Sequence, residues 1–228
     1  GCLVTSAEGS HFFGPLLQSD FPLELISPGD ARNFTVTTKP YGHSAEYRRL
    51  FGLPPERRLT HARFRRLIVY TDFAQNSFKI ARYVELRRRL RAHVTPAGRA
   101  RQRGVYLSRG RTGELRILSN EQAIIEFLDT QGFEILEPGS LRADEIAART
   151  LEAPLVISVE GSHLSHAIFS MKDAGTMLVL QPPDRFAMPY KEFTDSLGMR
   201  FAFLVGIPAK EGFEVPIDDL RRMLDCLS

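Results

Sequence analysis

Apolar and polar residues recur along this chain with two periods, one typical of short strands and the other of helices. In the first half, this pattern predicts strands over residues 2–5, 22–27, 34–38 and 65–70, and helices over 11–19, 43–52 and 76–92. The second half is more regular, with strands over 104–109, 133–137, 155–159, 176–181 and 200–206 and helices over 119–131, 140–150, 163–170, 190–196 and 216–226. Strands that alternate with helices of about ten residues predict a parallel sheet covered on both faces.

Residues 93–104, HVTPAGRARQRG, separate the two halves and show no hydrophobic periodicity, so we expect a linker there. The pattern on either side predicts two Rossmann-like, doubly wound α/β domains, over residues 1–95 and 104–228. A ligand would then bind in the cleft between the carboxyl ends of the two sheets. Because the chain begins with Gly1 and strand-like residues follow at once, we expect the N-terminal domain to be incomplete.

The composition is that of an ordinary globular protein, with 228 residues of which 43% are hydrophobic. No run approaches the roughly 18 apolar residues of a membrane span, and no signal peptide pattern is present, so we expect a cytoplasmic protein. The two cysteines, Cys2 and Cys226, stand at opposite ends of the sequence. That placement argues against a disulfide framework and a cysteine-based metal site.

The net charge is only +3, but arginines crowd between Arg82 and Arg116, where Glu85 and Glu114 are the acidic residues. Such a block attracts phosphate on a nucleotide, a lipid headgroup or a nucleic acid. The alternative is a solvated helix face followed by a basic linker. Residues 87–103 contain no aromatic side chain, which counts against a nucleic-acid interface.

The clearest candidate site follows the apolar strand LVISV at residues 155–159, which runs into Glu160, Gly161, Ser162 and His163. A buried strand that turns into a helix at a glycine leaves backbone N–H groups and a positive dipole end available to a phosphate. For His163, a purely structural role is an equal alternative. Gln181 ends the next strand and is a further candidate to face the cleft.

Two arginines form the second candidate group. Arg109 ends the strand over 104–109, and Arg116 stands shortly before Ser119, a plausible N-cap of the following helix. Two guanidinium groups near a helix start can grip a diphosphate, because each is a planar fork of donors that keeps its charge. The alternative is a pair of surface arginines in a loop.

These residues resemble glycosyltransferase family 61, of the bacterial capsular-polysaccharide type. Family members carry a strand ending in Ser-Arg, a basic loop, an Arg followed by Ile or Leu and shortly afterwards by Asn-Glu, and a helix; later come a strand, a glycine and a closing Phe. The resemblance implies that Arg109 and Arg116 bind the diphosphate and that Asn120 and Glu121 form the helix start that orders the loop. Many members have histidine where this chain has Glu160. The matching residues are Ser108, Arg109, Arg116, Ile117, Asn120, Glu121, Gly161, Leu164 and Phe169.

The resemblance implies a GT-B-like enzyme that transfers a sugar from a nucleotide-sugar donor, expected to be UDP-linked, to a glycan or lipid-linked glycan in surface-polysaccharide assembly. Transfer would be inverting and metal-independent, with no cofactor beyond the donor and no nucleic acid as partner. His11 is the favoured general base, and Glu160 would accept from donor hydroxyls or serve as the base itself. The protein would lie in the cytoplasm or at the inner face of the membrane.

Two alternatives remain from the sequence. One is a non-catalytic protein that uses the block from Arg82 to Arg116 to bind nucleic acid, a polysaccharide or a partner protein. The other is a degenerate transferase that binds without turnover. The sequence lacks GxxxxGK[ST], GxGxxG, GxSxG and HExxH motifs, which disfavours P-loop enzymes, classical dinucleotide enzymes, α/β-hydrolases and zinc proteases.

Overall fold

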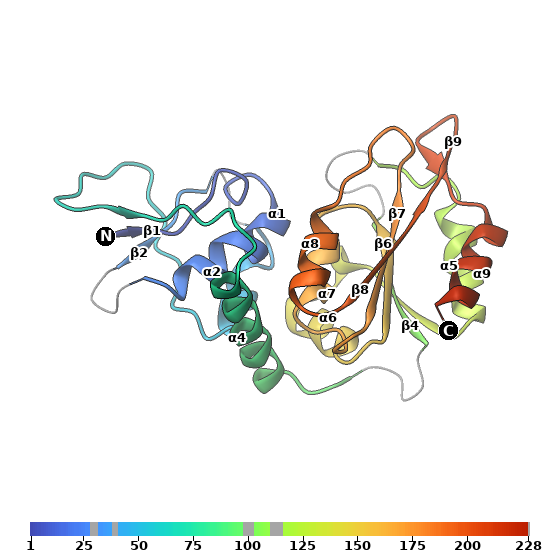
Figure 1. Ribbon diagram of the computed structural model, residues 1–228, viewed down its shortest axis with the longest axis horizontal. Coiled ribbons are helices and arrows are strands. Elements are labelled where there is room, and N and C mark those ends of the chain that lie inside the picture. The colour runs from blue at the N-terminus through green and yellow to red at the C-terminus, as the bar shows by residue number, and fades with distance from the viewer. Residues whose placement is uncertain (28–31, 38–40, 98–102, 110–115, 228) are drawn as a thin grey trace. The chain divides into compact units, whose positions relative to one another are not determined.

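The computed structural model describes residues 1–27, 32–37, 41–97, 103–109 and 116–227. The chain divides into two compact units, Gly1–Val94 and Thr95–Ser228, each with its own parallel sheet (Figure 1). The predicted α/β class with parallel sheets is therefore confirmed. Residues 98–102 of the expected linker and 110–115 of the basic loop lie outside the described residues.

The N-terminal unit contains a small sheet in the order β2-β1-β3, in which both neighbouring pairs are parallel. Its strands are shorter than the apolar pattern predicts, and residue 38 of one predicted strand lies outside the described residues. They are β1 (Cys2–Leu3), β2 (Asn33–Phe34) and β3 (Ile68–Val69), and the longer helices are α3 (Ser44–Leu50) and α4 (Ser77–His93).

The predicted strand over 22–27 is wrong, because this segment continues a helix. Helix α1 (Phe13–Pro15) passes into a π-helical segment, η1 (Leu16–Asp20), and then into α2 (Phe21–Glu24). Pro22 lies in the first turn of α2, where a residue without a backbone N–H is tolerated. The Tyr83 hydroxyl donates to the carbonyl of Gln18, in the π-helical segment, at 2.9 Å. A residue distant in sequence thus anchors this helical stretch.

The C-terminal unit is built on a five-stranded sheet in the order β5-β4-β6-β7-β8, with every neighbouring pair parallel. This is the strand order of the flavodoxin-like doubly wound fold. All residues of β6 and β7 are buried, which explains their uninterrupted apolar sequences. The strands are β4 (Gly104–Leu107), β5 (Phe133–Leu136), β6 (Leu155–Val159), β7 (Thr176–Gln181) and β8 (Arg200–Val205).

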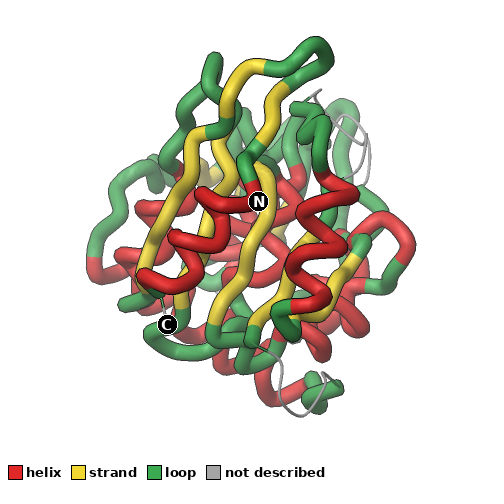
Figure 2. The backbone as a smooth tube through the Cα atoms, turned by 90° about the vertical axis from the view of Figure 1, so that its right-hand side faces the viewer, coloured by secondary structure: helices red, strands yellow, loops and turns green. Residues whose placement is uncertain are grey.

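Helices cover both faces of this sheet. Helices α5 (Glu121–Thr130) and α9 (Ile217–Cys226) lie on one side, and α6 (Ala143–Thr150), α7 (Ser165–Ile168) and α8 (Pro189–Ser196) lie on the other (Figure 1). Figure 2 shows helices in front of the strands when this unit is viewed from the side. The first layer packs Ile124, Leu128, Leu220 and Leu224 against the sheet residues Ile157 and Leu178.

Three features of the C-terminal unit depart from the predicted pattern. The expected helix over 163–170 is a 3₁₀ turn, η3 (Ser162–Leu164), followed by the four-residue α7, so its aligned peptide dipoles are few. A second 3₁₀ turn, η2 (Pro138–Ser140), precedes α6. A short antiparallel pair, β9 (Ile207–Pro208) and β10 (Phe213–Glu214), was not predicted. No helix among the described residues is long and apolar enough to cross a membrane.

Candidate active site

The candidate site lies where the strand order of the C-terminal sheet reverses. Strands β4 and β6 are neighbours in the sheet. The chain leaves β4 toward one face, where α5 lies, and leaves β6 toward the other face, where α7 lies (Figure 1). In doubly wound sheets, ligands bind outside the carboxyl ends of the strands at this switch point. Arg109 follows β4 by two residues and Glu160 follows β6 directly. The structure therefore places both predicted residues at the switch point.

Arg109 spans the gap between these two strand ends. Its Nη1 donates to the carbonyl oxygen of Glu160 at 2.9 Å, and the residue is 8% exposed. Gly161 makes this approach possible. A Cβ on Gly161 would overlap the Arg109 guanidinium, and the Gly161 φ of +153° lies in a region that residues with a Cβ rarely adopt. The glycine is thus required by both the backbone and its neighbour.

Arg116 reaches the same point from the far end of the basic loop. Its Nη1 lies 3.1 Å from Oε2 of Glu160 and 3.4 Å from the Glu160 carbonyl oxygen. Both side chains of this ion pair are buried. Two guanidinium groups therefore meet at one residue, and the Glu160 carboxylate, predicted to accept from a substrate hydroxyl or to act as a base, is engaged by Arg116.

The start of α5 orders the loop that carries Arg109. Oε1 of Glu121 accepts from the backbone N–H of Arg109 at 3.1 Å and from the Tyr106 hydroxyl at 2.9 Å. The side-chain amide of Asn120 bonds to the backbone of Val215. Its Nδ2 donates to the Val215 carbonyl at 2.8 Å and its Oδ1 accepts from the Val215 N–H at 3.2 Å. These bonds anchor the start of α5 and leave Asn120 facing the backbone rather than the Arg109 side chain.

His163 lies beside the two arginines and bonds to the sheet beneath. Its Nε2 is 2.5 Å from Oγ of Ser158, and that hydroxyl also donates to the carbonyl of Leu107. Removal of the ring from water lowers the pKa of His163 to about 3, with the charges of Arg109 and Arg116 acting in the same direction. The imidazole is therefore neutral at physiological pH.

Sequence reasoning missed Ser158 and Tyr190. Ser158 is the one polar residue within LVISV, and it connects the ends of β4 and β6 through its bonds to Leu107 and His163. The Tyr190 hydroxyl donates to the Gly161 carbonyl at 2.6 Å and lies 3.1 Å from Oγ of Ser165. A serine inside a buried apolar strand was the available signal for the first residue. Tyr190 had none, because it comes from a distant helix.

Two further predicted ligand residues of this unit, Gln181 and Ser162, differ in how accessible their side chains are. Gln181 is fully buried, and its amide bonds to Ala187, with Nε2 donating to the carbonyl at 2.7 Å. It supports the loop after β7. Ser162 opens the 3₁₀ turn after Gly161 and is partly exposed. Ser162 therefore stays a candidate ligand residue, whereas the Gln181 side chain is committed to its own loop.

His11 lies in the N-terminal unit, on an exposed turn before α1 rather than inside the predicted helix. Asp20 is in the same stretch but is buried, and its Oδ1 accepts from the Ser6 N–H at 2.8 Å. Burial raises the pKa of Asp20 to about 7, against the opposing effect of that hydrogen bond. A Cβ on Gly9 would overlap the Asp20 carboxylate, so the turn packs directly on this group.

Most arginines of α4 are engaged within the N-terminal unit. Arg82 is buried and grips Asp72 at two points, with Nη2–Oδ1 at 2.7 Å and Nη1–Oδ2 at 3.1 Å. Arg88 and Arg89 both donate to Glu85. The carboxylates that neutralise these arginines come from the unit itself. This part of the basic block stabilises the helix and its contacts, as the alternative interpretation of the block holds.

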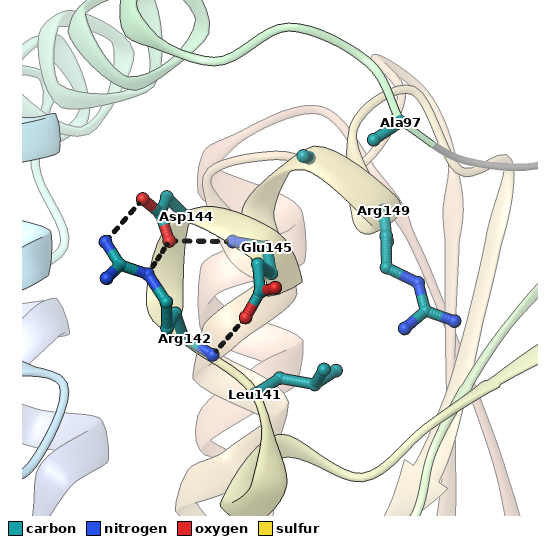
Figure 3. Close-up of a pocket in the computed structure, with 7 residues that line it drawn as sticks. Ala97, Leu141, Arg142, Asp144, Glu145 and Arg149 are labelled. Carbon is teal, nitrogen blue, oxygen red and sulfur yellow. Dashed lines mark hydrogen bonds and ion pairs between the residues drawn. The ribbon is translucent and has the colours of Figure 1, made fainter.

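Two hollows lined by described residues lie away from the switch point. One, of about 360 Å³, lies along α6 in the C-terminal unit, and three of its charged residues bond to each other: Arg142 pairs with Asp144 at 2.9 Å, and Glu145 accepts from the Arg142 N–H at 2.8 Å (Figure 3). The other, of about 650 Å³, is in the N-terminal unit and is lined by Tyr41 before α3, by residues of α3 such as Arg49, and by residues after it such as Glu56.

The Tyr41 hydroxyl donates to the carbonyl of Gly9 at 3.4 Å, in the turn that carries His11. One lining residue of the larger hollow, Tyr41, thus contacts the turn that carries His11. Among the described residues, no group of three or more His, Cys, Asp or Glu side chains is arranged to hold a metal ion.

A comparison with protein families identifies the family of this chain. The model of Glycosyltransferase 61 matches residues 11–178, which is more than half of the chain. The chain belongs to glycosyltransferase family 61. The predicted family and the predicted enzyme class, a glycosyltransferase, are thereby confirmed. The family 61 match begins at His11 and includes β4, β6 and the loops that follow them. No curated protein matches the chain significantly.

Proposed function

We propose that this glycosyltransferase uses a nucleoside-diphosphate sugar as donor, with UDP as the favoured nucleotide. The observation that carries the proposal is the convergence of Arg109 and Arg116 on Glu160 at the switch point of a parallel sheet. Guanidinium groups form short, charge-assisted hydrogen bonds to phosphate oxygens and keep their charge throughout the reaction. They suit a leaving group on which negative charge develops.

In the proposed inverting reaction, the acceptor hydroxyl attacks the anomeric carbon of the donor sugar. The bond from that carbon to the diphosphate oxygen breaks, and the electron pair leaves with the nucleoside diphosphate. Arg109 and Arg116 stabilise this charge, which is the role of preorganised cationic donors in catalysis. A general base receives the acceptor proton. The two guanidinium groups supply the positive charge in a metal-independent mechanism.

His11 is the proposed base, because it is exposed and imidazole accepts protons near neutral pH. We place the acceptor, a glycan or lipid-linked glycan, in the hollow of about 650 Å³ bordered by Tyr41. An aromatic ring together with Arg49 and Glu56 offers a stacking surface and hydrogen-bonding groups for a sugar. We further propose that the two units act as a GT-B pair in bacterial surface-polysaccharide assembly, at the cytoplasmic side of the membrane.

A ligand screen by thermal unfolding tests the donor class. UDP at roughly 100 times its dissociation constant should stabilise the native state by about 2.7 kcal/mol. UDP, other nucleoside diphosphates and UDP-sugars are compared with uridine, which lacks the diphosphate. Stabilisation by the diphosphates and not by uridine supports the proposal. No shift with any diphosphate or nucleotide sugar, in a sample that unfolds cooperatively, would contradict it.

A further inference from the structure

The hydrogen bonds of Ser158 determine which nitrogen of His163 carries the proton. Oγ of Ser158 has one hydrogen, and the Leu107 carbonyl within reach of it can only accept. Ser158 therefore donates to Leu107. Its Oγ must then accept from His163, whose Nε2 lies 2.5 Å away. A neutral imidazole has a single N–H, so the hydrogen sits on Nε2 and Nδ1 presents a lone pair.

Nδ1 lies on the side of the ring near the Arg109 guanidinium. It lies 3.1 Å from the point that a Cβ of Gly161 would occupy, the same point that overlaps the Arg109 guanidinium. Among the described residues, no donor forms a hydrogen bond to Nδ1. The pKa of about 3 keeps this nitrogen unprotonated at neutral pH. A hydrogen-bond acceptor therefore stands beside a pair of cationic donors.

We infer that His163 accepts a hydrogen bond through Nδ1 from a hydroxyl of the donor substrate and does not bind its phosphates. This inference rests on the proposed function of the site. A lone pair repels an anionic phosphate oxygen, whereas Arg109 and Arg116 attract it. The site thus recognises two parts of the donor. The guanidinium groups bind the diphosphate, and His163 binds a hydroxyl of the ribose or of the transferred sugar.

The tautomer can be measured without any ligand. Nitrogen-15 NMR of histidine-labelled protein at neutral pH should show His163 with the proton on Nε2, and His163→Phe identifies its signals by their loss. Ser158→Ala removes the acceptor of that proton and should weaken the tautomer preference. A proton on Nδ1, or a doubly protonated ring, in the wild-type protein would overturn the inference.

Binding measurements test the hydroxyl contact. His163→Phe keeps a planar ring but no acceptor, and Ser158 keeps its bond to Leu107. The variant should bind UDP or a UDP-sugar about tenfold more weakly, while its affinity for pyrophosphate, which has no sugar hydroxyl, stays within about twofold. His163→Asn places an acceptor at the δ position and should recover part of the loss. Weaker binding of both nucleotides indicates a ribose hydroxyl, and weaker binding of the UDP-sugar alone indicates a sugar hydroxyl.

Equal losses for pyrophosphate and the nucleotides would overturn the inference, because His163 would then support the phosphate site as a whole. Unchanged affinity for both nucleotides would also overturn it. If the wild-type chain binds neither pyrophosphate nor any nucleotide, the proposed function itself fails and this inference fails with it. The two failures are therefore distinguished by the wild-type measurement.

Discussion

The two units each bury arginines, but they use them differently. In the N-terminal unit, Arg82 places both terminal nitrogens of its guanidinium on one carboxylate, Asp72, and both partners belong to the same local structure. In the C-terminal unit, Arg109 donates to a backbone carbonyl and Arg116 lies on one carboxylate oxygen, both at Glu160. The first arrangement joins a helix to a loop; the second gathers guanidinium groups at the carboxyl edge of a sheet.

The two units also differ in the length of their strands and in the polarity of their cores. The N-terminal unit has strands of two residues and buries a Glu24–Arg48 ion pair. The C-terminal unit has a five-stranded sheet whose central strands are wholly buried, and its core is a large apolar cluster. In this account, position at a strand end, and not the density of arginines in the sequence, marks the proposed anion site. The following predictions test this comparison.

The largest effect is expected from removing one partner of the buried ion pair in the N-terminal unit. Nη1 of Arg48 lies 2.6 Å from Oε1 of Glu24, and Nη2 donates to Oε2 at 2.8 Å. Glu24→Ala leaves Arg48 charged and buried, and should lower the free energy of unfolding by about 3 to 5 kcal/mol. Denaturant unfolding followed by circular dichroism measures the loss. Asp218→Ala, which breaks an exposed pair with Arg221, is the control and should change stability by less than about 1 kcal/mol. Equal effects would contradict a structural role for the buried pair.

Gly161→Ala tests the C-terminal unit. The added Cβ meets the Arg109 guanidinium, and the backbone sits at a φ of +153°, so the loop must move. Strain of about 1 to 3 kcal/mol and the displaced arginine should reduce UDP affinity by more than about tenfold. Gly139→Ala is the matched control, because a Cβ there meets nothing within 4 Å and the residue has no positive φ. Calorimetric titration with UDP compares them, and equal affinities would show that the Gly161 loop does not shape the site.

The pH dependence of stability should have opposite signs in the two units. Asp20 has a folded pKa of about 7, raised from 3.8, so the native state holds a proton that the unfolded chain releases between about pH 4 and 7. Its contribution to stability is lost as the pH rises through this range. His163 has a folded pKa of about 3, lowered from 6.5, so its contribution is lost as the pH falls from about 6.5 toward 3.

Hydrogen exchange, followed by mass spectrometry of peptides from each unit, separates these two contributions. Between about pH 6.5 and 4.5, after correction for intrinsic exchange rates, acidification should increase protection in the N-terminal unit and decrease it in the C-terminal unit. Asp20→Asn should reduce the first slope, and His163→Asn the second. Slopes of the same sign in both units would contradict the assigned protonation states.

The smallest effect is expected from Glu160→Gln. The amide keeps the size of the side chain but loses the ion pair with Arg116. If Glu160 only positions Arg116, UDP affinity should change by no more than a few fold and turnover should fall modestly. If Glu160 is the general base, turnover should instead collapse while UDP binding persists. Steady-state rates and UDP titration of the same variant distinguish these outcomes, with His11→Ala as the comparison for the proposed base.

The sequence predicted the sheet of the C-terminal unit well because its strands are continuous apolar runs bounded by turns. The positions of Arg109 and Glu160 followed, since residues just after parallel strands meet at one edge of the sheet. The strand predicted over 22–27 was wrong because a short apolar run does not distinguish a strand from a buried helix, and the contact that anchors this helical stretch comes from Tyr83, far along the chain. The partners of Asn120 and Gln181 could not be predicted from the sequence either. Asn120 bonds to the backbone of Val215, far along the chain, and Gln181 bonds to the backbone of Ala187 in the loop after β7.

The central claim is that Arg109 and Arg116 bind the diphosphate of the donor. Calorimetric titration of UDP into Arg109→Ala and Arg116→Ala tests it most directly, with Arg88→Ala as a control, because Arg88 lies on exposed helix surface and pairs with Glu85. Each site variant should lose on the order of 2 kcal/mol of binding free energy, and Arg109→Lys should also bind more weakly, because an ammonium lacks the planar fork. The control should match the wild type. Wild-type UDP affinity in both folded alanine variants would contradict the account and return the two arginines to a structural role.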